Sequence, residues 1–183
     1  YGGSSLAHYV FVGDKYVHIS KKEDVFFQYQ IISDKIIVLG GPIGNREAFY
    51  EAIKEFYDLA DLYGYTLVFS GVDMNIFPEL HDMGYDFYDT AECYTGVNPD
   101  GSTAYNEEVV GEAVKPFRKD IILCTKFGVK HMGDHLEFDS SPETIRKSLE
   151  GSLKKLQTDY VDVYYQHRID PKVEPEVVAG VMK

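Results

Sequence analysis

Residues 121–126 read Ile-Ile-Leu-Cys-Thr-Lys, an apolar run of strand composition that ends in a lysine. Two similar runs flank it along the chain. Residues 85–89 read Tyr-Asp-Phe-Tyr-Asp, and residues 161–167 read Val-Asp-Val-Tyr-Tyr-Gln-His. Successive runs are separated by about the length of one strand–helix–strand unit, in which the two strands are parallel. Because the C-terminal ends of such strands lie side by side, we expect the terminal aspartate, lysine and histidine to share one site.

The residues that end these strands suggest carbonyl reduction. Reduction by a nicotinamide hydride requires a proton donor at the oxygen that gains negative charge. A tyrosine is a poor acid, with an ordinary pKa of about 10, unless a nearby ammonium stabilises its phenolate. Tyr94 would be the donor and Lys126 would make it a better acid. Asp89 would orient Lys126, and His167 would position the carbonyl oxygen.

The composition restricts the other classes of function. The formal net charge of −12 is unfavourable for binding a nucleic acid, so we expect no such partner. Cys93 and Cys124 are too few for a disulfide scaffold or a zinc site, which predicts reduced thiols and a cytoplasmic location. No stretch approaches the ~20 apolar residues of a membrane span. His131 and His135 lie in a glycine-containing loop, and we expect no metal there.

The first half of the chain has a different pattern. Strands at residues 9–12 and 16–19, and again at 25–32 and 36–39, flank short turns and predict antiparallel hairpins. Residues 45–64 then follow helical spacing, from a possible Asn cap to a possible Gly stop.

Residues 65–183 alternate between strand and helix patterns. Asn106 and Ser141 are possible helix caps, and a last helix is expected to begin near Pro175. We therefore predict an α/β fold in which N-terminal antiparallel hairpins lead into a mainly parallel β/α sheet or a partial (β/α) barrel. A single continuous sheet is physically possible. The predicted domains are residues 1–86 and 87–183.

The second half resembles the aldo-keto reductases over roughly residues 85–183. The motifs that carry this resemblance are residues 87–94 (FYDTAECY), 106–111 (NEEVVG), 125–128 (TKFG), 141–143 (SPE), 148–153 (SLEGSL) and 162–168 (DVYYQHR).

This resemblance implies a fold, a cofactor and a set of site residues. The family folds as a (β/α)₈ barrel and binds NADPH, with which it reduces small aldehydes and ketones. Asp89, Tyr94, Lys126 and His167 match the positions of its catalytic tetrad. Only units that resemble strands two to four of the barrel are present, whereas a full barrel needs about 250 residues. The family's later strands and loops, which hold the nicotinamide, have no counterpart here, and no cofactor-binding residue is assigned.

The first half is similar to part of the C-terminal domain of phosphatidylglycerol lysyltransferases, which has an acetyltransferase-like fold. The similarity rests on residues 5–8 (SLAH), 13–15 (GDK), 39–44 (LGGPIG) and 80–85 (LHDMGY). Residues 39–44 allow two interpretations: an anion-binding loop, or a turn that needs positive φ. The two resemblances meet near residue 86, which predicts a chimera.

Three functions therefore remain open at this stage. The chain could be an NADPH-dependent carbonyl reductase, a fragment of an aminoacyl transferase, or a catalytically silent chimeric fold. A homo-oligomer could complete a barrel from two half-barrels.

Overall fold

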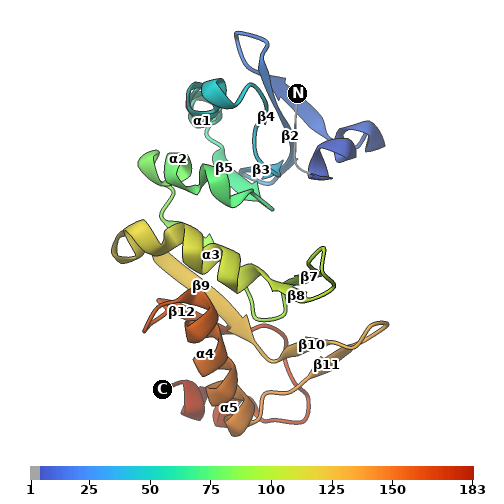
Figure 1. The fold of residues 1–183 in the computed structure, drawn as a ribbon, viewed down its shortest axis with the longest axis vertical. Coiled ribbons are helices and arrows are strands. Elements are labelled where there is room, and N and C mark those ends of the chain that lie inside the picture. Colours follow the sequence, from blue (N-terminus) through green and yellow to red (C-terminus); the bar gives the residue numbers. More distant parts are fainter. Residues whose placement is uncertain (1–4) are drawn as a thin grey trace. The chain divides into compact units, whose positions relative to one another are not determined.

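The computed structural model describes residues 5–183, so residues 1–4 of the predicted N-terminal domain lie outside the described part. The chain divides into two compact units, one ending at Met83 and the other beginning at Gly84 (Figure 1). The strands of the two units belong to separate sheets. Among the described residues, no helix is long and apolar enough to cross a membrane.

The N-terminal unit is built on one mixed sheet with the order β1-β2-β3-β5. Antiparallel pairing joins β1 to β2 and β2 to β3, whereas β3 and β5 are parallel; β4 pairs with β2. Residues 25–32 and 35–39 thus form an antiparallel pair. The strands are β1 (Tyr16–Ile19), β2 (Val25–Ile32), β3 (Lys35–Leu39), β4 (Ile43–Gly44) and β5 (Thr66–Ser70).

Helix α1 (Phe49–Leu62) supplies the core of this unit and contacts β2 and β5. The short 3-10 helix η2 (Arg46–Ala48) precedes it, and the Asn45 side chain caps η2 by accepting a hydrogen bond from the Glu47 amide. A further short pair, η3 (Met74–Ile76) and α2 (Phe77–Asp82), ends the unit. The buried face of α1 is the one that the helical spacing predicts: Phe49, Ala52, Ile53, Phe56 and Ala60.

Residues 9–12 are not a strand, and that prediction was wrong. They belong to η1 (Ser5–Val12), a 3-10 helix. The Gln28 side chain, fully buried in β2, donates a hydrogen bond of 2.6 Å to the Leu6 carbonyl in η1. The edge of β2 is already occupied by β1, so residues 9–12 have no strand to pair with there.

The loop at residues 39–44 favours the turn interpretation. Gly40 has a φ of +76° and Gly44 a φ of +135°, values that side-chain-bearing residues rarely adopt. A Cβ on Gly44 would also overlap the Asp24 carbonyl oxygen. Glu47 stands in the first turn of the following helix, where its charge opposes an anion.

The C-terminal unit is built on three parallel strands in the order β12-β9-β6. In Figure 1 the long β9 arrow leads toward the hairpin of β10 and β11. The strands of this sheet are β6 (Phe87–Asp89), β9 (Ile122–Phe127) and β12 (Val163–Gln166). Two hairpins that the sequence did not predict are β7 (Thr95–Val97) with β8 (Thr103–Tyr105) and β10 (Val129–His131) with β11 (Leu136–Phe138).

Helices α3 (Asn106–Val114), α4 (Pro142–Leu156) and α5 (Pro175–Met182) pack in sequence, α3 on α4 and α4 on α5. The 3-10 helix η4 (Lys115–Asp120) leads from α3 to β9. Ser141 caps α4 as predicted, because its hydroxyl accepts from the Thr144 amide. Asn106 does not cap α3: it is the first helical residue, and its side chain accepts a hydrogen bond from Thr90 instead.

Candidate active site

The parallel sheet of the C-terminal unit brings the three predicted strand-end residues together. Asp89 closes β6, and Lys126 is the second-last residue of the central strand β9. His167 follows β12 directly, and its backbone amide donates to the Phe127 carbonyl at 3.0 Å. Since β6 and β12 both pair with β9, the three side chains lie at one end of the sheet.

The Lys126 ammonium is held by two oxygen atoms. Its Nζ lies 2.6 Å from Asp89 Oδ2 and donates to the Thr90 carbonyl at 2.8 Å. The Lys126 side chain is only 15% exposed. Its two oxygen partners fix the ammonium in place.

Tyr94 comes from the loop after β6 and completes the group. Lys126 Nζ lies 5.1 Å from the centroid of its ring, within the range of a cation–π contact. The His167 ring meets the Tyr94 ring edge to face, with centroids 5.6 Å apart. All four predicted residues therefore meet, and the ammonium contacts the face of the tyrosine ring.

His167 is a neutral group at neutral pH. Burial lowers its pKa below the ordinary value, and the charges of Lys126 and Arg168 lower it further, while Asp89 opposes them. Its Nδ1 lies 3.3 Å from Cys93 Sγ. A neutral imidazole at this position can donate one hydrogen bond to a substrate oxygen.

Sequence reasoning missed the residues that hold the loop after β6. The Thr90 hydroxyl donates to Asn106 Oδ1 at 2.7 Å, and Glu92 Oε1 accepts from the Gly128 amide at 2.8 Å. Cys93 was considered only as a reduced thiol, although its place next to Tyr94 was a signal. These contacts fix the loop that presents Tyr94.

An open hollow of about 690 Å³ lies beside this group, and its lining has no acidic residue, lysine or arginine. It is formed by Cys93, Tyr94, Thr95, Gly96, Ala104, Tyr105, Asn106, Val109 and His131. His135 pairs with Asp134 at 2.7 Å in the neighbouring hairpin. Within residues 5–183, no group of three or more His, Cys, Asp or Glu side chains could hold a metal ion.

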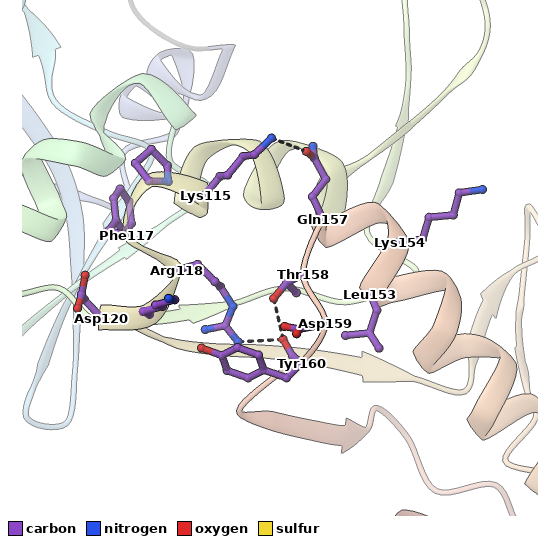
Figure 2. A pocket seen from close by; sticks show the side chains of 12 residues that line it. Lys115, Phe117, Arg118, Asp120, Leu153, Lys154, Gln157, Thr158, Asp159 and Tyr160 are labelled. Atoms are coloured by element: carbon purple, nitrogen blue, oxygen red, sulfur yellow. Dashed lines mark hydrogen bonds between the residues drawn. The ribbon is translucent and has the colours of Figure 1, made fainter.

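A second hollow, of about 870 Å³, lies at the opposite ends of the strands, where the chain enters β9 and β12 (Figure 2). Arg118 points to the Tyr160 backbone carbonyl there, to which it donates at 2.9 Å, and it also pairs with Asp162. Its guanidinium lies 3.9 Å from the centroid of the Tyr160 ring. These contacts join the segment that precedes β9 to the segment that precedes β12. They indicate a structural role for this end of the sheet.

Comparison with known proteins also divides the chain into two parts. The model of the aldo/keto reductase family matches residues 75–183. The model of the phosphatidylglycerol lysyltransferase C-terminal domain matches residues 1–97. The chain thus belongs to the aldo/keto reductase family through its second half and to the lysyltransferase family through its first, and is a chimera of the two.

Individual relatives agree with this division. The chain is 40% identical over 102 residues to the probable aldo-keto reductase 1 of Glycine max, covering 55% of this chain and 28% of that protein. It is 35% identical over 92 residues to the phosphatidylglycerol lysyltransferase of Staphylococcus epidermidis, covering 50% of this chain and 11% of that protein. The chain therefore spans well under half the length of either relative.

Solved structures of both types are also similar. An aldo-keto reductase from Bacillus halodurans, in its holo form, is 30% identical with a TM-score of 0.48, covering 59% of this chain and 35% of that one. The L-PGS structure from Bacillus licheniformis is 34% identical with a TM-score of 0.44, covering 45% of this chain and 26% of that one.

Proposed function

We propose that the C-terminal unit carries the catalytic tetrad of an aldo-keto reductase and reduces small aldehydes or ketones. The tetrad is Asp89, Tyr94, Lys126 and His167. The observation that carries this proposal is the meeting of these four side chains, with Lys126 bound to Asp89 at 2.6 Å and in contact with the Tyr94 ring. The family membership of residues 75–183 supports it.

The residues divide the proton chemistry between them. A carbonyl compound that reaches the four residues beside the hollow would accept a hydrogen bond from the neutral His167, which would orient its oxygen. As negative charge develops on that oxygen, the Tyr94 hydroxyl donates a proton to it. The Lys126 ammonium stabilises the phenolate that this leaves, and Asp89 holds Lys126 in place.

The hydride for this reduction would come from NADPH, which the family generally uses, but the hollow does not fit the whole cofactor. In the part of the chain that the structure describes, the lining of the hollow includes no lysine or arginine to pair with the phosphates. It fits a neutral carbonyl compound. No residue is therefore assigned to the cofactor, and weak NADPH binding is expected.

The test is NADPH consumption by the purified chain with a panel of aromatic and aliphatic aldehydes. We expect turnover at high NADPH concentration, and Tyr94→Phe should reduce it to a small residual rate without unfolding the chain, as judged by circular dichroism. Tyr160→Phe is the matched control. Tyr160 is 42% exposed against 41% for Tyr94, and it also lies under a cation, but at the other end of the strands. No turnover, or equal turnover in Tyr94→Phe, would refute the proposal.

We also propose that the two parts of the chimera, residues 1–86 and 87–183, join near residue 86. The two family matches overlap over residues 75–97, and residue 86 lies within this overlap.

Both cysteines are free, which supports the expected cytoplasmic location.

The family match of residues 1–97 supports a second candidate, aminoacyl transfer to a lipid. It predicts binding of charged tRNA, or of vesicles that contain anionic lipid, that weakens as salt increases. Failure of both this assay and the reductase assay would leave a catalytically silent chimera.

A further inference from the structure

The contact between Cys93 and His167 bears on which ring nitrogen of His167 holds the proton. Cys93 Sγ lies 3.3 Å from His167 Nδ1, although the two residues are 74 positions apart. Cys93 is buried, with 8% of its surface exposed. A neutral imidazole has one protonated and one bare nitrogen, and the partner of one nitrogen decides which is which.

Two observations give the direction of this hydrogen bond. Burial raises the pKa of the Cys93 thiol, so the sulfur keeps its proton at neutral pH. The bare nitrogen of an imidazole is a good acceptor, whereas sulfur is a weak one. The arrangement S–H to Nδ1 is therefore the stronger of the two, and it leaves the ring proton on Nε2.

We propose that Cys93 is a positioning residue that donates its thiol proton to His167 Nδ1 and so keeps the imidazole in the Nε2–H form. In residues 5–183 no group hydrogen-bonds to Nε2, so this N–H stays available for a substrate oxygen. The tautomer follows from the contact and from the protonated thiol, and only its use in catalysis rests on the proposed function. Cys93 acts through His167.

The direct test is the tautomer of His167, measured by two-bond ¹H–¹⁵N correlation spectra of the full chain labelled at histidine. The pH is set near 8, above the ordinary histidine pKa of about 6.5, so that the ring is neutral. His167→Asn identifies the signal among the six histidines. The charged and titratable groups that act on the ring are Lys126, Arg168, Asp89 and His131.

We expect the Nε2–H form in the wild type and in Cys93→Ser, whose hydroxyl can also donate. In Cys93→Ala a substantial share of the Nδ1–H form is expected. Cys124→Ala is the matched control, because it removes the other buried thiol, which lies in β9, and it should leave the tautomer unchanged. A dominant Nδ1–H form in the wild type, or an unchanged ratio in Cys93→Ala, would overturn the proposal.

Kinetics separate this inference from the proposed function. Cys93→Ala is expected to reduce kcat about fivefold, the effect of one ordinary hydrogen bond, and Cys93→Ser to restore most of it. If the wild type has no reductase activity but shows the Nε2–H form with the expected variant response, the reductase proposal fails and the tautomer assignment stands. If the wild type is active but shows the Nδ1–H form, the tautomer assignment fails and the reductase proposal stands.

Discussion

The two units use the same strand–helix–strand connection and end their strands differently. In the N-terminal unit the parallel strands β3 and β5 lead into Gly40 and Gly71, whose φ values are +76° and +68°. In the C-terminal unit the corresponding strand ends carry Asp89, Lys126 and His167. A parallel sheet thus provides a common end for its strands, and only the residues there make that end a chemical site.

The glycines of the N-terminal unit serve packing instead. A Cβ on Gly41 would lie 3.0 Å from the Ile76 side chain, and one on Gly71 would lie 3.0 Å from the Leu6 side chain. Those two apolar residues therefore cover the strand ends closely. We therefore expect the chemistry at the strand ends of this chain to lie in the C-terminal unit.

Lys126→Met is expected to reduce turnover more than any other change considered below. Among the described residues, Lys126 is the only cation that contacts both Asp89 and Tyr94. Turnover should fall by about 10²- to 10⁴-fold, the range for lost proton-transfer catalysis. Steady-state kinetics at saturating aldehyde would measure it. Lys119→Met, at the opposite ends of the strands, should leave turnover unchanged, and an equal loss there would contradict the assignment.

Phe56→Ala should affect the N-terminal unit and spare the site. Phe56 is 1% exposed and packs against the rings of His18, Phe27 and Tyr29. Its loss should reduce the free energy of unfolding by about 3–5 kcal/mol, measured by urea titration. Turnover of the folded variant is expected to persist.

The exposed Tyr50→Ala is the control on the same helix, with an expected change within about 0.5 kcal/mol. A loss of turnover in folded Phe56→Ala would show that the two units depend on each other for chemistry.

Gly111→Ala tests the close approach of α3 and α4, which supports the sheet that carries the site. A Cβ there would lie 2.6 Å from the backbone of Leu156. The expected cost is about 1–3 kcal/mol of unfolding free energy, seen in thermal or urea unfolding. Gly151→Ala in α4 meets nothing within 4 Å and should stabilise the protein by up to about 1 kcal/mol. Equal effects at the two positions would argue against the helix packing.

The smallest expected effect is a pH dependence that involves the N-terminal core. Burial lowers the pKa of His18, with Glu55 opposing it, so the folded state resists protonation. The unfolded state takes up a proton near pH 6.5. The contribution of His18 to the free energy of unfolding is therefore constant above that pH, and it falls as the pH drops from there through the pKa of His18 in the folded state.

His18→Phe should reduce this fall while retaining the ring stack on Phe56, whose centroid lies 4.3 Å from that of His18. Urea unfolding at pH 7.5 and 5.5 would measure the difference. His167, whose pKa is also lowered, contributes with the same sign and accounts for part of what remains. An unchanged pH dependence in His18→Phe would contradict the role given to His18.

The sequence predicted most of what the parallel sheet determines. The positions of Asp89, Lys126 and His167 follow from strand direction alone, and helix α1 follows from its apolar spacing. It failed where tertiary contacts decide. Residues 9–12 have strand composition but lie in a 3-10 helix. The contact between Cys93 and His167 joins residues 74 positions apart and depends on the path of the loop after β6.

The central claim is that the tetrad acts as one catalytic unit, and a double variant tests it most directly. Residues that act together lose their effect together, so their single losses do not add. We predict that the variant with both Tyr94→Phe and Lys126→Met has the same residual turnover as Tyr94→Phe alone, within a few-fold. If the wild type is active and the two losses multiply, Tyr94 and Lys126 act separately and the account is contradicted.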